Sequence, residues 1–303
     1  MAAISVEHIS KQYGETKALE SVSFEVKEAE LFGLIGPDGA GKSTLFRILT
    51  TLLLADEGEA YVAGHHVVKD YKEIRKKVGY MPGKFSLYQD LSVEENLSFF
   101  ATIFGTTIEE NYELIKDIYV QIEPFKKRPA GKLSGGMKQK LALCCALIHK
   151  PEVLFLDEPT TGVDAVSRKE FWEMLKQLKA KGITILVSTP YMDEASLCDR
   201  IALIQSGKIL TINTPKGLMN EFTKPLYAVK AENTYKLLTF LRQQDFTDTV
   251  LPFGEFLHLT TEEDMPESEI ENHLKADGFE KAEVKRIEPT VEDIFLALSS
   301  ETE

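Results

Sequence analysis

Cysteine is scarce in this 303-residue chain, and long apolar runs are absent. The three cysteines, two of them adjacent (Cys144 and Cys145), fit neither a disulfide framework nor a metal-binding spacing, so we expect them to fill the core. No apolar stretch approaches the roughly 18 residues that a membrane span requires. The chain enters a strand-like pattern by Ile4 without the features of a signal peptide. We therefore expect a cytoplasmic protein that reaches a membrane only through another protein.

Basic residues are also in deficit. The chain has 35 Lys and Arg against 48 Asp and Glu, a net charge of −13, which disfavours nucleic acid as a partner. Hydrophobic residues make up 43% of the chain, as in an ordinary globular protein, and the length is sufficient for two domains.

Alternating strands and helices are predicted for the first two thirds of the chain. Residues 1 to about 30 alternate in the manner of strands, with residues 20, 22, 24 and 26 on one face and residues 19, 21, 23 and 25 on the other. Short apolar runs predict buried strands at 31–35, 153–156 and 183–187. Helical patterns run from 42 to about 54 and from about 85 to 132, with Ser92 and Glu95 placed as a capping box. The alternation predicts a largely parallel sheet covered by helices, with ligands at the carboxyl ends of its strands.

A second unit begins near Pro215. Its pattern is strand (226–230), helix (234–243), two strands turning near Gly254, helix (267–276), strand (282–287) and a last helix that Thr290 would cap, with Asp293 three residues on. The order β-α-β-β-α-β predicts a small ferredoxin-like α+β domain. We expect one domain over residues 1–220 and a second over 221–303.

A glycine-rich segment lies between the predicted strand 31–35 and the predicted helix from residue 42. It fits G-x-x-x-x-G-K-[ST]-T and comprises Gly36, Pro37, Asp38, Gly39, Ala40, Gly41, Lys42, Ser43 and Thr44. Its backbone N–H groups and the helix N-terminus suit the phosphates of ATP. Lys42 would neutralise the β- and γ-phosphate oxygens, and the Ser43 hydroxyl would bind Mg²⁺. Asp38 must point away from the phosphates.

Two acids end the predicted strand 153–156. Asp157 would hold Mg²⁺ through water, and Glu158 would polarise the attacking water as general base. Taken alone, two acids at a strand end are more often solvated. Their position downstream of Lys42 and before Pro159-Thr160 favours the catalytic interpretation.

Residues 133–140 (Leu-Ser-Gly-Gly-Met-Lys-Gln-Lys) resemble the signature of ATP-binding cassette (ABC) proteins. The segment combines a serine hydroxyl, two glycines and a helix N-terminus, which together form a second anion site. The resemblance spans residue 4 to about 220. It implies an α/β P-loop NTPase fold with a mostly parallel sheet, a small antiparallel β subdomain and a helical subdomain at about 85–150. In that family two cassettes dimerise head to tail, so Ser134, Gly135 and Gly136 would act on ATP held by the partner.

The resemblance implies two further site residues. Tyr13 is similar to the aromatic residue that stacks on adenine, although an aromatic residue in a strand core would give the same pattern. Asp164, in Thr161-Gly162-Val163-Asp164, is similar to the aspartate of the loop that crosses the dimer interface. Residues 288–295 resemble the C-terminal extension of cassettes that serve ABC-2 type bacterial exporters. That resemblance implies integral membrane permease subunits as partners, on the inner face of the cell membrane.

Two positions depart from the family. Gly83 stands where the family usually has a glutamine that touches the metal and the attacking water, and Gln89 is too far along the chain to replace it. Pro190 stands where the family usually has a histidine that contacts the γ-phosphate. Loss of one such donor typically costs about 10²–10³ in rate. We therefore expect this site to hydrolyse ATP slowly, and we expect the intact signature to serve a different cassette in a heterodimer.

Two alternative functions stay open. A regulatory cassette that binds ATP with little turnover would fit Gly83 and Pro190. A soluble ABC ATPase of DNA repair or translation would carry long insertions or two cassettes in one chain, and the sequence has neither.

Overall fold

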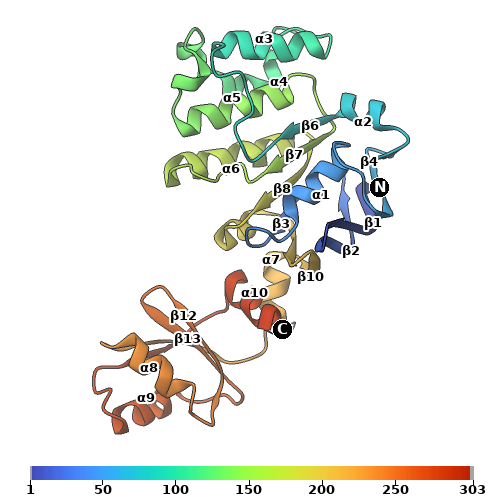
Figure 1. Ribbon diagram of the computed structural model, residues 1–303. Helices are drawn as coiled ribbons and strands as arrows, with labels where there is room; N and C mark the ends of the chain where they lie inside the picture. The colour runs from blue at the N-terminus through green and yellow to red at the C-terminus, as the bar shows by residue number, and fades with distance from the viewer. Residues whose placement is uncertain (1, 301–303) are drawn as a thin grey trace. The chain divides into compact units, whose positions relative to one another are not determined.

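The computed structural model describes residues 2–300, which form two compact units (Figure 1). The first ends at Pro215 and the second begins at Lys216, at the start of helix α7 (Pro215–Glu221). The expected boundary at residue 220 lies near the other end of this helix. No helix within residues 2–300 is both long and apolar enough to cross a membrane.

A six-stranded sheet forms the centre of the first unit. Its spatial order is β10 (Lys208–Asn213), β9 (Arg200–Gln205), β3 (Leu31–Ile35), β8 (Thr184–Thr189), β7 (Val153–Asp157) and β6 (Val78–Met81). All neighbouring pairs are parallel except β9 and β10. The strands β3, β7 and β8 are buried along their whole length, which explains their unbroken apolar runs.

A smaller antiparallel sheet precedes it. Its order is β2 (Thr16–Lys27), β1 (Ala2–Tyr13), β4 (Glu57–Val62) and β5 (His65–His66). The predicted alternation fails at Ser21, whose φ of 51° shifts the register between β1 and β2. Leu19 and Val22 are therefore both buried, although the alternation placed them on opposite faces.

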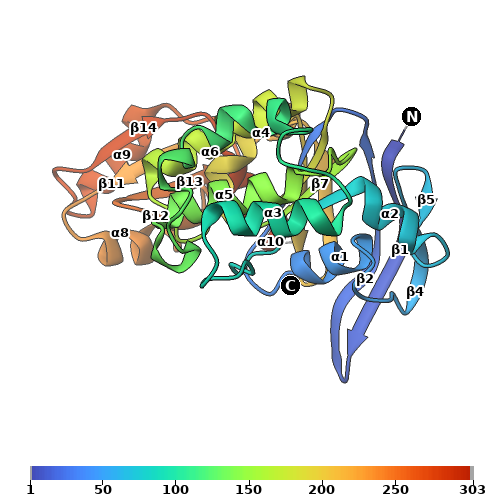
Figure 2. The ribbon, with the colours of Figure 1, turned by 90° about the horizontal axis from the view of Figure 1, so that it is seen from above.

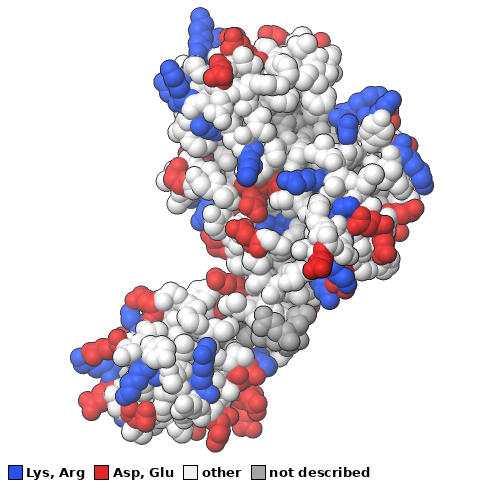
Figure 3. Space-filling model, viewed as in Figure 1, with Lys and Arg blue, Asp and Glu red and all other residues white. Residues whose placement is uncertain are grey.

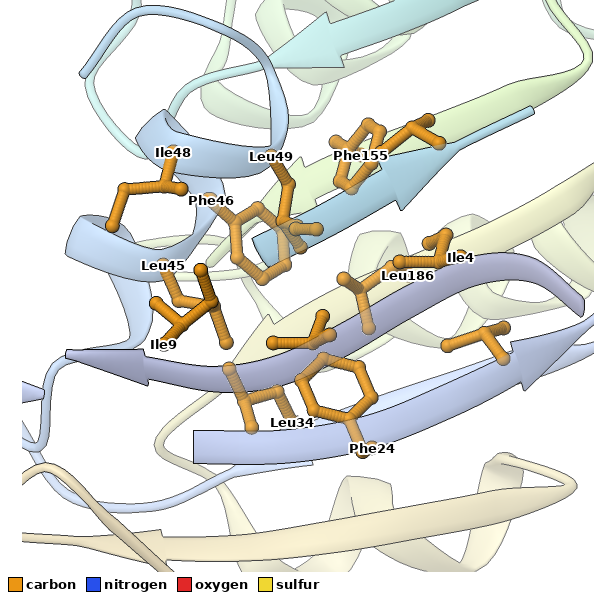
Figure 4. Packing of buried hydrophobic residues seen from close by; sticks show 14 of the residues in the cluster. Ile4, Ile9, Phe24, Leu34, Leu45, Phe46, Ile48, Leu49, Phe155 and Leu186 are labelled. Carbon is orange, nitrogen blue, oxygen red and sulfur yellow. The ribbon is translucent and has the colours of Figure 1, made fainter. Parts of the chain in front are cut away.

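Helix α1 (Lys42–Leu49) joins the two sheets into one core. In Figure 4 its Leu45, Phe46 and Leu49 point among apolar side chains from β1, β2, β3, β7 and β8. The Phe46 ring meets that of Phe155 edge to face at 5.9 Å. The helix is shorter than the predicted 42 to 54, because Thr51 adopts a left-handed φ of 64°.

A helical subdomain extends from β6, where α3 and α5 run side by side (Figure 2). It contains α3 (Val93–Ile103), α4 (Tyr112–Tyr119), the short 3₁₀ turns η1 (Glu123–Phe125) and η2 (Ala130–Lys132), and α5 (Gly135–Leu147). The capping box of Ser92 and Glu95 is confirmed. The prediction of helix from residue 85 was wrong, because residues before Ser92 make turns that Asn96 holds through bonds to the backbone of Tyr88 and Leu91.

Three helical segments complete the first unit. They are α2 (Tyr71–Lys77), α6 (Ala165–Ala180) and the 3₁₀ helix η3 (Met192–Leu197). Helix α6 packs against β3 and β8. The predicted α/β architecture, with a mostly parallel sheet, a small antiparallel sheet and a helical subdomain, is confirmed.

The second unit has the predicted β-α-β-β-α-β order. Its elements are β11 (Leu226–Lys230), α8 (Thr234–Leu241), β12 (Thr247–Phe253), β13 (Phe256–Thr261), α9 (Glu267–Ala276) and β14 (Glu283–Arg286), followed by α10 (Val291–Ser300). The sheet order β12-β13-β11-β14, antiparallel throughout, confirms the ferredoxin-like topology. Thr290 and Asp293 cap α10 as predicted, with Asp293 N donating to Thr290 Oγ1 and Thr290 N donating to the Asp293 carboxylate.

Candidate functional site

The register of the parallel sheet brings the predicted site residues to one edge. Ile35 pairs with Thr189, Asp157 with Ser188, and Met81 with Leu156. The segments that follow these strands therefore lie side by side at their carboxyl ends. They carry the glycine-rich loop, the two acids, Gly83 and Pro190.

The glycine-rich loop is shaped by close backbone approaches. A Cβ on Gly36 would lie 2.1 Å from the carbonyl oxygen of Ile204, and one on Gly41 would lie 2.3 Å from that of Ala18. Gly39 and Gly41 also have positive φ, of 81° and 101°. Gly41 caps α1 without a side-chain acceptor, so the first N–H groups of this helix are left for an anion.

Lys42 lies inside this loop and is almost fully buried. Its Nζ donates to the carbonyl oxygens of Gly36 (2.8 Å) and Pro37 (2.9 Å) and lies 3.1 Å from Oε1 of Glu158. The structure thus brings together the predicted phosphate-binding cation and the predicted general base. Pro37, Asp38 and Gly39 are exposed, Ala40 is buried, and Ser43 and Thr44 are half-buried.

Ser188 orients both acids, a role that sequence reasoning missed. Its hydroxyl donates to Oδ1 of Asp157 at 2.7 Å, and Glu158 N donates to the Ser188 hydroxyl (3.0 Å) and carbonyl (3.1 Å) oxygens. Glu158 has a left-handed φ of 51°, a strained conformation common at functional sites.

The donor set suits magnesium. Mg²⁺ prefers hard oxygen ligands and retains several waters, so it needs only one or two protein groups beside the phosphates. The Ser43 hydroxyl and the buried Asp157 carboxylate are such groups. Residues 2–300 contain no cluster of three or more His, Cys, Asp or Glu that would indicate a different metal site.

Gly83 lies beside the acids, and Pro190 lies beside the glycine-rich loop. A Cβ on Gly83 would lie 3.0 Å from the carbonyl oxygen of Asp157. Gln89 lies elsewhere, with its carbonyl accepting from Gly131 N beside η2. Pro190 follows Thr189, whose carbonyl accepts from Gly36 N at 3.3 Å. The 3₁₀ helix η3 begins two residues after Pro190, with Tyr191 as its N-cap.

The signature residues begin helix α5. Ser134 is its N-cap, with Oγ accepting from Met137 N at 3.4 Å, and Gly135 is exposed. A Cβ on Gly136 would lie 2.7 Å from Oγ of Ser167, so this glycine lets α5 pack against α6. Among residues 2–300, no hydrogen bond or ion pair joins these three residues to the glycine-rich loop.

Asp164 and Tyr13 are both exposed. Asp164 caps α6, accepting from the N–H groups of Val166 and Ser167, and these bonds lower the pKa of its carboxyl. Tyr13 ends β1 and is 46% exposed, with the Lys11 ammonium 5.8 Å from its ring centre. That exposure excludes the alternative of a core aromatic residue.

The sequence of this chain is similar to those of known proteins. The model of the ABC transporter family matches residues 19–161. The Nod factor export ATP-binding protein I of Rhizobium sp. (strain N33) is 34% identical over 303 residues, covering 98% of this chain and 97% of that protein. The chain belongs to the ABC transporter family. The family membership predicted from the sequence is confirmed.

Other ABC proteins resemble parts of the chain. The probable multidrug ABC transporter ATP-binding protein YbhF of Escherichia coli K12 is 42% identical over 217 residues. The match covers 71% of this chain but only 38% of YbhF, so the chain spans less than half the length of that relative. A dimeric structure of the ABC cassette MJ0796 in a post-hydrolysis state, bound to ADP and Pi, aligns with a TM-score of 0.63 and 26% identity, covering 70% of this chain and 98% of that one.

Proposed function

We propose that this chain is the subunit that binds and hydrolyses ATP to power a membrane exporter. The observation that carries the proposal is the convergence of Lys42, Asp157 and Glu158 at the ends of β3 and β7. The full-length relative named for Nod factor export supports transport out of the cell. Residues 1–220 would form the ATP-binding domain, and residues 221–303 an accessory domain.

Each residue of the site has a proposed role. The N–H groups of residues 36–44 and the Lys42 ammonium bind the phosphates, and Tyr13 stacks on adenine. Ser43 and Asp157 would hold Mg²⁺, whose charge would offset that of the transferred phosphoryl group. Glu158 orients and polarises the attacking water.

The signature is proposed to complete the ATP site of a second cassette. Ser134 and the N–H groups that begin α5 offer donors, and within residues 2–300 no hydrogen bond joins Ser134 to this chain's own phosphate loop. MJ0796 provides a relative whose cassette is dimeric. ATP between two such surfaces would drive dimerisation, and Asp164 lies in the loop expected at that interface.

The chain's own site is proposed to turn over slowly. Gly83 lies against the carbonyl of Asp157 but has no side chain to reach water or metal. Pro190 lies beside the phosphate loop but has neither an N–H group nor a ring donor for the γ-phosphate. A heterodimer would accommodate both the slow site and the intact signature of this chain, because the signature would serve a more active cassette.

A groove in the first unit provides a surface for a permease. It has a volume of about 430 Å³ and lies between the end of β6 and the helices α3 and α5, lined by apolar residues that include Tyr80, Met81, Pro82, Phe100, Ile103 and Ala146. Ile103, on its rim, is 60% exposed. An apolar helix from the cytoplasmic side of a permease would fill it, which would hold the cassette at the inner face of the membrane. Since Pro82, the residue before Gly83, lines the groove, its occupant would lie close to the hydrolytic site.

Charge on the surface agrees with a protein partner. On the face in Figure 3, basic and acidic side chains are interspersed rather than gathered into one basic patch, which nucleic acid would require. Purification of the chain from native membranes tests the proposal. We expect a permease and a second, different cassette to accompany it, whereas recovery without any membrane protein would contradict it.

A regulatory cassette with little turnover is the second candidate, favoured by Gly83 and Pro190. Substitution of Glu158 by Gln separates the two functions. An ATPase would lose turnover and accumulate as an ATP-bound dimer, while a regulatory binder would change little.

A further inference from the structure

Glu194 is a buried carboxylate for which the site described above has no use. It lies in η3 and is 2% exposed. Its Oε2 accepts hydrogen bonds from two hydroxyls, Thr189 Oγ1 at 2.6 Å and Thr160 Oγ1 at 3.1 Å. One carboxylate oxygen therefore joins two separate loops.

Both loops border the hydrolytic site. Thr189 precedes Pro190, and its carbonyl accepts from Gly36 N at the start of the phosphate loop. Its hydroxyl also accepts from Tyr191 N at 3.1 Å, which holds the chain on the far side of Pro190. Thr160 lies in the turn after Glu158, where Thr161 N donates to the Glu158 carbonyl at 3.2 Å. A change at Glu194 would thus reach both sides of the site.

The other carboxylate oxygen lacks a hydrogen bond. Oε1 is buried without a donor, and Nε of Arg168 lies 3.7 Å away, too far for a bond. Arg168 belongs to the first turn of α6, where its N–H donates to the carbonyl of Asp164. An approach of about 1 Å would give a charge-assisted hydrogen bond of ordinary length. Movement of the Asp164 loop would therefore change the distance between Arg168 and the Glu194 carboxylate.

We propose that Glu194 is a positioning residue for ATP hydrolysis. Its carboxylate holds the loop of Pro190 and the turn after Glu158 in one arrangement, and Arg168 links that arrangement to the Asp164 loop. This chain needs such a positioning residue, because Pro190 has no donor for the γ-phosphate, and bound ATP therefore cannot fix the Pro190 loop. The inference rests on the proposed function, in which this site hydrolyses ATP.

The test substitutes Glu194→Gln in the full chain. Glutamine keeps the shape and one acceptor oxygen but removes the charge that faces Arg168. Amide hydrogen exchange should rise in both segments 157–163 and 187–193. In single-turnover assays the hydrolysis rate should fall roughly ten-fold or more, because positioning is lost, while the ATP dissociation constant stays within about two-fold.

Matched variants make the result specific. Asp193→Asn removes the neighbouring carboxylate, which also pairs with Arg168 (3.1 Å) but is exposed and has no bond to either threonine, so it should behave as wild type. Thr189→Val should reproduce the loss of rate without touching the charge, and Thr189→Ser, which keeps the hydroxyl, should restore it.

Two outcomes would overturn the proposal. One is a rise in exchange confined to residues 192–197. The other is an equal loss of ATP affinity and rate in Glu194→Gln, with Thr189→Val unaffected. A wild-type chain that hydrolyses no ATP would contradict the proposed function instead, and the exchange data would then decide whether Glu194 holds the two loops.

Discussion

The Lys42 ammonium lies 3.1 Å from the Glu158 carboxylate, so the phosphate-binding cation and the proposed general base form an ion pair. Lys42 is buried, and its other partners are the carbonyl oxygens of Gly36 and Pro37. An anionic phosphate that binds Lys42 would compete with Glu158 for the same charge. Binding of ATP would thereby release the carboxylate to act on water.

The substitution Glu158→Gln should separate binding from hydrolysis. Loss of a general base typically costs about 10²–10⁴ in rate. Because the amide competes less strongly for Lys42, ATP should bind at least as tightly as in the wild type. Equilibrium nucleotide titration and single-turnover hydrolysis measure the two quantities. Weaker ATP binding by the variant would show that the ion pair does not oppose phosphate.

His149 should make the first unit sensitive to acid. Burial lowers the pKa of its ring. The hydrogen bond between Nε2 and the Val78 carbonyl raises that pKa, but by less than burial lowers it. The unfolded chain, with a histidine pKa of about 6.5, binds a proton before the folded chain does. Stability should therefore decline as the pH falls through about 6.5 and level off below the folded pKa.

The variant His149→Phe provides the comparison. It keeps a ring to stack on Phe104, whose centroid lies 3.8 Å from that of His149, and it cannot titrate. Its melting temperature should depend less on pH than that of the wild type in this window. Parallel curves for the two proteins would rule out His149 as the cause.

A buried hydrogen bond should stabilise α10 on the second unit. His258 Nδ1 lies 2.5 Å from Oδ1 of Asp293, and both residues are buried. Removing one partner of a buried hydrogen bond typically costs about 1–3 kcal/mol. We expect Asp293→Asn to raise hydrogen exchange in residues 290–299. The exposed neighbour variant Glu292→Gln should leave it unchanged, and equal effects of the two would contradict the assignment.

The sequence was sufficient for the parts of the site that are contiguous. The loop 36–44 and the pair Asp157–Glu158 each carry their geometry in one short segment, because a strand end and a helix start fix the backbone. Ser188 and Glu194 were missed, since their partners come from other loops and no spacing along the chain reveals them. The register shift at Ser21 and the early end of α1 before Thr51 depend on single left-handed residues. Neither residue is a glycine, so the sequence does not predict a left-handed backbone at these positions.

The central claim is that Gly83 and Pro190 make this site a slow one. Single-turnover ATP hydrolysis by the purified chain tests it directly, in the wild type and in Pro190→His with and without Gly83→Gln. We expect slow hydrolysis by the wild type and a gain of roughly ten-fold or more when the donor is restored at position 190. The Gly83→Gln change should add to it, since the new Cβ requires only a small shift of the Asp157 carbonyl. Rapid hydrolysis by the wild-type chain, unchanged in both variants, would contradict the account.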